Sequence, residues 1–273
     1  MENSEKKKVV REVYGEIATS SSSSCGCCSS CGESSDIPVK DVAFNDDYTG
    51  LEGYNPDADL SLGCGIPTDV IDILPGQTIV DLGSGAGNDC FVAGRLVGDD
   101  GQVIGVDMTR NMIELAKENA EKLGVSNVKF RLGDIEDLPI TAKKADVVIS
   151  NCVINLVPDK GAAFNEIRRV LKPGGYFSIS DVVVEGIIPE VLREQANFYA
   201  GCVSGAVSLK EYLYLINQTG FKNVSVRKRK RLELPDSLLK DILDEVEYRL
   251  YQEAEIGIYS VTVYGENPEC CSN

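Results

Sequence analysis

Apolar and polar positions alternate along the middle of the chain in a way that predicts strands and helices in turn. Short apolar runs bounded by glycine or polar residues predict five strands, at residues 78–83, 102–107, 127–134, 145–151 and 176–184. Longer stretches with apolar residues at helical spacing predict the helices between them, at residues 87–97, 109–124 and 159–171. Strands that alternate with helices form right-handed crossovers. The sequence therefore predicts an α/β fold with a doubly wound, mostly parallel sheet.

The pattern is looser at both ends of the chain. Residues 5–18 carry valine and isoleucine at helical spacing and predict a short amphipathic helix, which a flexible Ser/Gly/Cys tract follows. Residues 189–219 predict helices, and two later apolar runs predict strands that pair antiparallel at one edge of the sheet. We therefore expect three parts, an N-terminal segment, a central α/β domain and a C-terminal α+β region, at residues 1–40, 41–185 and 186–273.

Charge and hydropathy narrow the class of partner. Lys+Arg 27 against Asp+Glu 43 gives a net charge of −16, which disfavours nucleic acid and anionic membranes and favours small neutral or cationic ligands. The basic run RKRKR at 227–231 is interpreted as a solvated strand or loop. The N-terminus lacks the apolar core of a signal peptide, and no uncharged apolar stretch is long enough to span a bilayer. A cytoplasmic location is expected.

The chain has ten cysteines and no histidine. Cytosolic thiols stay reduced, so the cysteines need a role other than structural disulfides, and the usual general base is missing. Cys152 follows the fourth predicted strand, at the edge where open α/β sheets bind substrate. Cys64 and Cys202 have glycine neighbours, which predicts accessible thiols. Cys90 lies inside a predicted helix and is interpreted as part of the core.

A glycine-rich turn follows the first predicted strand. The motif VDLGSGAGND places Gly83, Gly85 and Gly87 before a helix, where the backbone can approach a ligand closely. Asp107 ends the second predicted strand, where its carboxylate can accept hydrogen bonds from both hydroxyls of a ribose. Both NAD and S-adenosylmethionine fit this pattern.

Two details favour S-adenosylmethionine over NAD. The dinucleotide fingerprint has a glycine where this chain has Asn88. Asp81, before the glycines, would repel a pyrophosphate but suits a ligand that carries an ammonium and a sulfonium. Asp134 and Ile135 follow the third strand and can hold an adenine edge and face. The predicted cofactor-binding residues are Asp81, Gly83, Ser84, Gly85, Gly87, Asp107, Met108, Asp134, Ile135 and Asn151.

Three thiols near a sulfonium indicate a soft, thiophilic substrate. Trivalent arsenic bound to three sulfurs keeps a lone pair, which can attack the donor methyl in line without prior removal of a proton. The absence of histidine agrees with this chemistry, because the thiolates are the only ionisations required. We therefore predict Cys64, Cys152 and Cys202 as catalytic residues and as the arsenic ligands.

The chain resembles arsenite S-adenosylmethionine methyltransferases over nearly its whole length. The segments that carry the resemblance are REVYGEIA, SLGCGIP, DLGSGAGNDCFVA, GVDMTRNMIELA, GDIEDLP, SNCVINLVPDK, RVLKPGG and YAGCVSGA. SLGCG, SNCVINL and AGCVSGA together are far more specific than the motifs shared with other methyltransferases. The resemblance implies a Rossmann-like sheet, a central domain that binds S-adenosylmethionine and a C-terminal region that binds arsenic. It also implies arsenite or methylarsenite as substrate, in detoxification.

The resemblance assigns roles to the cysteines as well. Cys152 and Cys202 would bind arsenic throughout the cycle, and Cys64 would be the third ligand early and a redox partner later. A thiol reductant of the thioredoxin or glutathione type would restore the thiols. The family has a further cysteine that can pair with the one in SLGCG; here Cys31 is the nearest of four candidates, the others being Cys25, Cys27 and Cys28.

Several alternatives stay open. The CxxC spacings of the N-terminal tract also permit zinc or a second arsenic site. The chain could be a quinone or phenol methyltransferase with incidental cysteines, although no proton acceptor follows the fourth strand. It could also be a non-catalytic thiol-based metalloid binder, although Asp81, the glycines and Asp107 favour a cofactor site. Cys270 and Cys271 receive no role.

Overall fold

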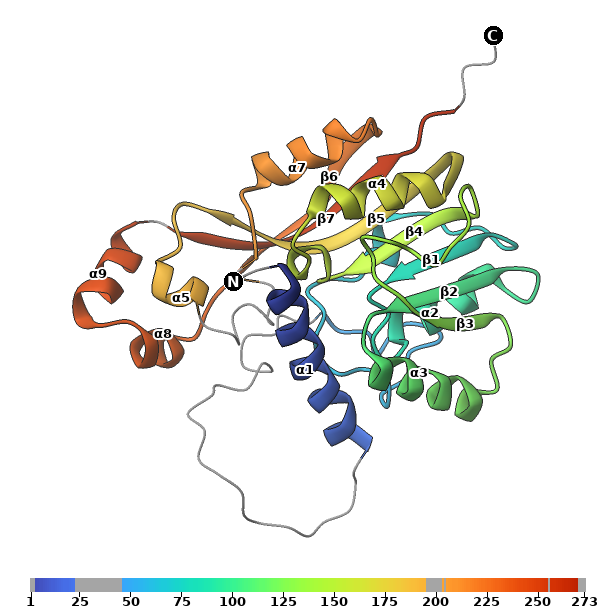
Figure 1. The fold of residues 1–273 in the computed structure, drawn as a ribbon, viewed down its shortest axis with the longest axis horizontal. Coiled ribbons are helices and arrows are strands. Elements are labelled where there is room, and N and C mark those ends of the chain that lie inside the picture. Colours follow the sequence, from blue (N-terminus) through green and yellow to red (C-terminus); the bar gives the residue numbers. More distant parts are fainter. Residues whose placement is uncertain (1–2, 23–45, 195–202, 204, 255, 270–273) are drawn as a thin grey trace.

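A seven-stranded sheet runs through the centre of the protein (Figure 1). The computed structural model describes residues 3–22, 46–194, 203, 205–254 and 256–269. The strand order is β3-β2-β1-β4-β5-β7-β6. The strands are β1 (Thr78–Leu82), β2 (Gln102–Asp107), β3 (Val128–Leu132), β4 (Ala145–Asn151), β5 (Leu171–Glu185), β6 (Lys222–Leu232) and β7 (Gly257–Glu266).

The pairing of the strands confirms the predicted fold class. Strands β1 to β5 pair in parallel, whereas β7 pairs antiparallel with both β5 and β6. The strand order reverses at β1: β2 and β3 extend the sheet on one side of it, and β4 and β5 extend it on the other. In open α/β sheets, ligands bind outside the carboxyl ends of the strands at such a reversal. This edge is therefore where a site is expected.

Helices cover both faces of the sheet. The helices of the described residues are α1 (Asn3–Ser22), α2 (Asn88–Val97), α3 (Arg110–Leu123), α4 (Lys160–Val170), α5 (Glu190–Glu194), α7 (Leu209–Gln218), α8 (Asp236–Ile242) and α9 (Glu245–Glu253), with short 3-10 turns η2 (Pro67–Val70) and η3 (Ile154–Leu156); α2 and α3 cover one face and α4 and α7 the other. Helix α3 begins after Thr109 and ends at Gly124, whose φ of 64° is left-handed. Both boundaries follow from the sequence, because glycine adopts that conformation without strain. No helix of the described residues is long and apolar enough to cross a membrane.

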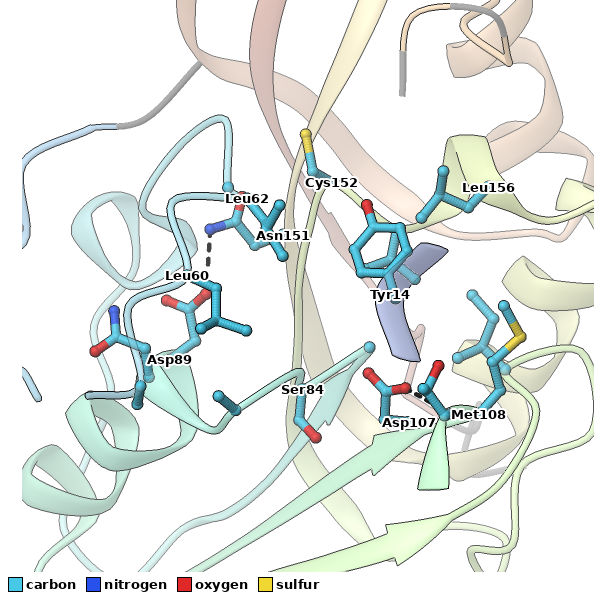
Figure 2. Close-up of a pocket in the computed structure, with 18 of the residues that line it drawn as sticks. Tyr14, Leu60, Leu62, Ser84, Asp89, Asp107, Met108, Asn151, Cys152 and Leu156 are labelled. Atoms are coloured by element: carbon cyan, nitrogen blue, oxygen red, sulfur yellow. Dashed lines mark hydrogen bonds between the residues drawn. The ribbon is translucent and has the colours of Figure 1, made fainter. Parts of the chain in front are cut away.

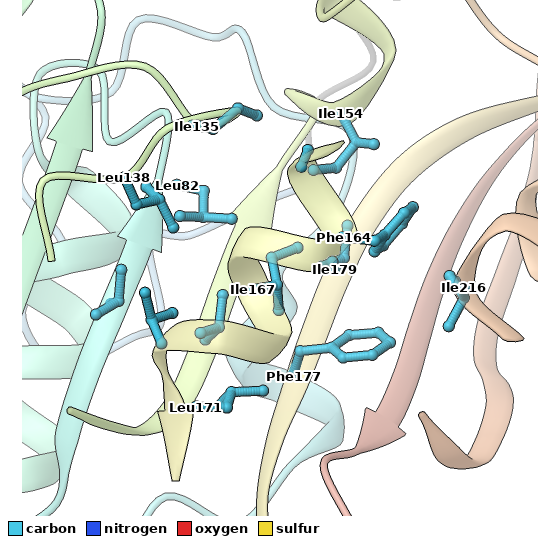
Figure 3. Close-up of a cluster of buried hydrophobic side chains, with 14 of the residues drawn as sticks. Leu82, Ile135, Leu138, Ile154, Phe164, Ile167, Leu171, Phe177, Ile179 and Ile216 are labelled. Carbon is cyan, nitrogen blue, oxygen red and sulfur yellow. The ribbon is translucent and has the colours of Figure 1, made fainter. Parts of the chain in front are cut away.

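Alternate residues of each strand pack against opposite helical layers. On one face, Ile79 and Val103 pack with Phe91 of α2 and Met112 of α3. On the other face, the helices are α4 and α7, and Figure 3 shows the cluster formed there by residues that include Leu82, Phe164, Ile167, Leu171, Phe177, Ile179 and Ile216. Successive side chains of a strand point to opposite faces, so one apolar strand contributes to both layers.

Helix α1 lies beside the carboxyl ends of the strands rather than apart from the domain (Figure 1). Its Val10 is 2% exposed and packs in the apolar cluster that contains Cys64 and Cys152. Lys7 of the same helix pairs with Asp134 and Glu136. The amphipathic pattern of residues 5–18 therefore reflects a face that packs against the central domain.

Two features of the C-terminal region were not predicted from the sequence. Helices α8 and α9 lie between the two late strands, where no element was predicted; α9 has no fully buried residue, and its Tyr248 and Tyr251 pack partly buried against an apolar cluster. The basic run 227–231 lies in β6, and its Lys228 and Lys230 both pair at 2.9 Å with Asp46. These lysines thus hold Asp46, which lies in the segment that leads to Cys64.

Candidate functional site

A cavity lies at the carboxyl ends of β1, β2 and β4, at the point where the strand order reverses (Figure 2). Residues from α1, from the segment 46–63 and from these strand ends line it. Asp89 and Asn151 lie on one side of the cavity, Asp107 and Met108 on the opposite side, and Cys152 stands above the space between them. The cavity therefore has two polar ends and a cysteine near its middle.

The glycine turn closes tightly under this cavity. The backbone N–H groups of Gly83 and Ser84 donate to the carbonyl of Val106 at 2.7 and 3.0 Å. Gly83 has a φ of 67°, and a Cβ there would lie 2.3 Å from a methyl carbon of Val153. Only glycine fits that position, as the motif predicted. Gly83 and Ser84 line the cavity, whereas Gly85 and Gly87 do not.

Asp107 lies at the cavity wall with its carboxylate held by the backbone. Its two oxygens accept hydrogen bonds from the N–H groups of Gly85 at 3.0 Å and Thr109 at 2.8 Å. Burial raises the pKa of Asp107, and these N–H donors partly offset the rise. The Thr109 side chain and the Met108 N–H also favour the ionised carboxylate, which lines the cavity. The carboxylate can therefore accept hydrogen bonds from a ligand diol.

Asp81 is placed differently from the prediction that it faces a cationic ligand. It is 2% exposed, does not line the cavity, and accepts a hydrogen bond from the Cys90 thiol at 3.1 Å. Burial, with the nearby charge of Asp89, raises the pKa of Asp81 well above its usual range. Cys90 is fully buried, which confirms its interpretation as a core residue.

Asp134, one of the two residues predicted to bind adenine, also holds the N-terminal helix α1. Asp134 and Ile135 line the cavity, together with Met108. The carboxylate of Asp134 accepts a hydrogen bond from Lys7 at 2.5 Å, and Glu136 pairs with the same lysine. Helix α1 and the loop after β3 are thereby joined at the cavity rim.

Cys152 directly follows β4 and has an unusual backbone conformation. Its φ is 59°, and its N–H donates to the carbonyl of Ser180 on β5 at 2.8 Å. A left-handed non-glycine residue costs on the order of 1–3 kcal/mol, and such strain clusters at functional sites. Here it accompanies a cysteine that lines the cavity.

Cys64 is buried, so the predicted accessibility of its thiol was wrong. The residue is 1% exposed. A Cβ at Gly63 would lie 2.7 Å from the Asn151 amide, and one at Gly65 would lie 2.7 Å from the Ser180 hydroxyl. The flanking glycines therefore bring the backbone close to β4 and β5 instead of opening the surface.

Cys64 and Cys152 belong to one apolar cluster, which also contains Val203 and Ala206. Cys202 directly precedes that segment but lies outside the described residues, as do Cys31 and the rest of the N-terminal cysteine tract. Among the described side chains, no three potential metal ligands gather at one point. Cys64 and Cys152 thus share an apolar cluster, but only Cys152 of the two lines the cavity, and the set of three arsenic ligands stays a prediction.

Asn151 connects the two sides of the site. Its side-chain N–H groups reach the Tyr48 hydroxyl at 2.9 Å, the Gly65 carbonyl at 2.7 Å and the Asp89 carboxylate at 3.1 Å. Its side-chain oxygen accepts from the N–H of Cys64 at 3.0 Å. The amide therefore has a structural role next to Cys152, in addition to its place in the cavity wall.

Several cavity residues were not predicted as site residues, and three of them carry polar side chains near the cysteine or the glycine turn. Tyr14, Tyr48 and Asp89 all line the cavity. Asp89 stands in the first turn of α2, directly after the glycine motif, which is a signal that could have found it. Tyr14 lies in the REVYGEIA segment. Tyr48 lies in an irregular segment and carries no pattern of its own.

Comparison with known proteins places this chain in a family. A family model described as a methyltransferase domain matches residues 73–220. An arsenite methyltransferase of Halobacterium salinarum is 42% identical over 233 residues, which is 81% of this chain and 59% of that protein. The human arsenite methyltransferase is 42% identical over 168 residues, which is 58% of this chain and 44% of that protein.

A solved structure agrees with these relatives. The arsenic(III) S-adenosylmethionine methyltransferase of Chlamydomonas reinhardtii superposes with a TM-score of 0.63 and 33% identity, over 83% of this chain and 73% of that one. The chain spans only about three-fifths of the length of the Halobacterium protein. From the fold, the site and these similarities, the chain belongs to the family of arsenite S-adenosylmethionine methyltransferases.

Proposed function

We propose that this protein transfers a methyl group from S-adenosylmethionine to trivalent arsenic held by cysteine thiolates. One observation carries the proposal: Cys152 lines the same cavity as Asp107 and Met108. A soft thiolate ligand and a predicted donor-binding wall thus face one space. The names of the relatives support arsenite as the substrate class.

The described residues fit the donor. Asp107 presents an ionisable carboxylate to the cavity, where it can accept hydrogen bonds from the two ribose hydroxyls, and Met108 and Ile135 offer apolar surface to an adenine. When bound, S-adenosylmethionine supplies a methyl carbon activated by a sulfonium. Because Cys152 stands between the two polar ends of the cavity, a ligand seated across it would present its middle to that cysteine.

The cysteines would prepare arsenic for attack. Cys64, Cys152 and Cys202 would bind it as thiolates, and the apolar surroundings of the first two would exclude water from the thiolate bonds. The arsenic lone pair would form the bond to the methyl carbon, and the electrons of the broken carbon–sulfur bond would stay on the departing sulfur. No general base is needed, which agrees with a chain that has no histidine.

The methylated arsenic is then pentavalent and needs two electrons to return to the trivalent state. We propose that Cys64 and an upstream cysteine, with Cys31 the nearest, supply them by forming a disulfide. A small-molecule or protein thiol of the glutathione or thioredoxin type would reduce that disulfide. The buried position of Cys64 restricts this exchange to a state in which the residue becomes accessible.

Arsenic speciation tests the proposal. The protein is incubated with methyl-labelled S-adenosylmethionine, arsenite and a thiol reductant, and the arsenic species are separated. We expect labelled methylarsenicals and one S-adenosylhomocysteine for each methyl group transferred. Label transfer to a quinone or phenol but not to arsenite would favour a small-molecule methyltransferase with incidental cysteines. Arsenite binding without any donor binding would indicate a metalloid binder.

A further inference from the structure

Three carboxylates surround the glycine turn without a basic partner. Asp81, Asp89 and Asp107 each form no ion pair within 4.0 Å among the residues that the structure describes. A carboxylate removed from water is costly unless a cation or hydrogen-bond donors compensate for it. The positive charge that such a group needs can come from a ligand, provided that the carboxylate faces the space where the ligand binds.

Two of the three carboxylates meet that condition. Asp89 and Asp107 line the cavity, and Asp81 does not. Figure 2 shows Asp89 and Asp107 on opposite sides of the cavity, with Cys152 above the space between them. Asp107 is held by backbone N–H groups, whereas Asp89 accepts from the Tyr48 hydroxyl at 2.7 Å and from the Asn151 amide at 3.1 Å. These donors partly compensate for the buried carboxylate, but none of them brings a positive charge to Asp89.

We propose that Asp89 binds the ammonium group of the donor's amino-acid end. The inference rests on the proposed function, which seats S-adenosylmethionine in this cavity. With the ribose on Asp107, the amino-acid end reaches the opposite side, where Asp89 offers a carboxylate. The donor has two positive groups, the ammonium and the sulfonium. The sulfonium would lie in the middle of the cavity, below Cys152. Asp59 lines the cavity near Asp89 as well, but Asp89 is the carboxylate that Tyr48 and Asn151 hold in place beside Cys152, and we assign the ammonium to it.

This assignment links donor binding to the arsenic ligands. The Asn151 amide that donates to Asp89 also accepts from the N–H of Cys64. Asn151 directly precedes Cys152 in the chain. A donor bound at Asp89 therefore holds in place the Asn151 hydrogen bonds that position Cys64 and Cys152. Asp89 is a binding residue for the donor and a positioning residue for the two cysteines.

The surroundings of Asp89 also predict a pH dependence. Burial raises the pKa of Asp89 to about 6, and the hydrogen bonds from Tyr48 and Asn151 offset part of this rise, while the charges of Asp59 and Asp69 add to it. Asp81, packed behind the turn, is a further acidic neighbour. Below a pH of about 6, Asp89 becomes neutral and loses its attraction for an ammonium.

Two adenosine ligands separate this role from a general effect on the site. S-adenosylhomocysteine carries the amino-acid end, and 5′-methylthioadenosine lacks it; both keep the adenosine and a neutral thioether. Calorimetry gives the affinity of each for the parent and for Asp89→Asn. We expect the variant to bind S-adenosylhomocysteine about 10- to 100-fold more weakly, as for loss of a charged hydrogen bond, and 5′-methylthioadenosine within about twofold of the parent.

Two controls accompany the comparison. Asp107→Asn should weaken both ligands, because both contain the ribose. Tyr48→Phe removes one hydrogen bond from Asp89 but keeps its charge, so its effect on S-adenosylhomocysteine should be smaller than that of Asp89→Asn. In the parent, the affinity ratio of the two ligands should fall from about pH 7 to about pH 5, and Asp89→Asn should remove that fall.

The calorimetric results distinguish failure of this inference from failure of the proposed function. Equal weakening of both ligands by Asp89→Asn would assign the residue a structural role only and overturn the inference. An unchanged affinity for S-adenosylhomocysteine would overturn it as well, while the proposed function would stand. If the parent bound neither ligand, the proposed function itself would fail, and this inference with it.

Discussion

The side-chain oxygen of Asn151 accepts a hydrogen bond from the backbone N–H of Cys64 at 3.0 Å. The two residues are separated by 87 positions in the chain, and Asn151 is the neighbour of Cys152. The bond therefore ties the segment that carries one proposed arsenic ligand to the strand that carries the other. A tris-thiolate site needs its sulfurs at fixed separations, and this contact helps to set one of them.

Removal of the Asn151 amide should disturb that arrangement. Asn151→Ala leaves the Cys64 N–H and the Gly65 carbonyl without this partner, which should lower the free energy of unfolding by about 1–3 kcal/mol. Methylation of arsenite should fall more than that of methylarsenite, since the former uses all three thiolates. Denaturant unfolding and product formation measure the two effects. Asn217→Ala, an exposed amide on α7, is the control and should change neither.

Serine variants test the proposed ligands directly. Cys152→Ser replaces a soft ligand by a hard one of nearly the same size, so unfolding should change by about 1 kcal/mol or less while methyl transfer is lost. Cys202→Ser should behave alike, and Cys64→Ser should retain activity on methylarsenite. Product formation from both substrates is the measurement. Cys90→Ser is the matched buried control, and parental turnover by Cys152→Ser would refute the tris-thiolate site.

The pair between Lys7 and the loop after β3 should hold α1 over the cavity. The Lys7 side chain is 21% exposed and its partners Asp134 and Glu136 are 27% and 13% exposed, so the contact should contribute about 1 kcal/mol. Lys7→Ala should weaken donor affinity about 3- to 10-fold, and salt should reduce the difference. Calorimetry at two ionic strengths tests this. Lys8→Ala, which breaks only an exposed pair with Glu12, should have no effect.

Gly83 combines a left-handed backbone with a close neighbour. Gly83→Ala should lower the free energy of unfolding and abolish donor binding, because its Cβ meets Val153, the residue after Cys152. Gly98→Ala has a similar φ of 68° but no atom within 4 Å of its Cβ, so it should show the backbone strain of about 1 kcal/mol alone. Thermal unfolding with and without S-adenosylhomocysteine separates the two. Equal effects of both variants would mean that the Val153 contact is unimportant.

Asp181 should make the fold less stable as the pH rises. Burial raises the pKa of Asp181 to about 7, although the Val182 N–H and the charge of Lys160 favour its ionised form. The folded state therefore holds a proton that the unfolded state releases near pH 4, and this contribution is lost as pH rises from about 4 through about 7. The unfolding free energy of the parent should fall over this range relative to Asp181→Asn. Parallel pH profiles for the two proteins would contradict the assignment.

The periodic part of the chain could be predicted from the sequence because its signals are local. Strand and helix patterns alternate from residue 78 to residue 184, and each follows from the spacing of apolar side chains over a few residues. Asp107 and Gly83 were also found this way, since one ends a strand and the other requires a left-handed turn.

The misplaced residues depended on contacts between distant segments. Asp81 shares its strand face with Ile79, which packs toward α2, so its carboxylate meets Cys90 below the turn instead of the cavity. Cys64 has glycine neighbours because β4 and β5 approach its backbone, and nothing in the local sequence distinguishes that from an exposed loop.

The sequence by itself therefore determined the sheet, the glycine turn and the positions of the cysteines relative to the strands. Only the tertiary structure decided which acidic residues line the cavity, that α1 closes against it through Lys7, and that Asn151 joins Cys64 to β4. The physical reason is range: apolar periodicity acts between neighbours in the chain, whereas the direction of a side chain in a site depends on segments that meet only when the whole sheet has assembled.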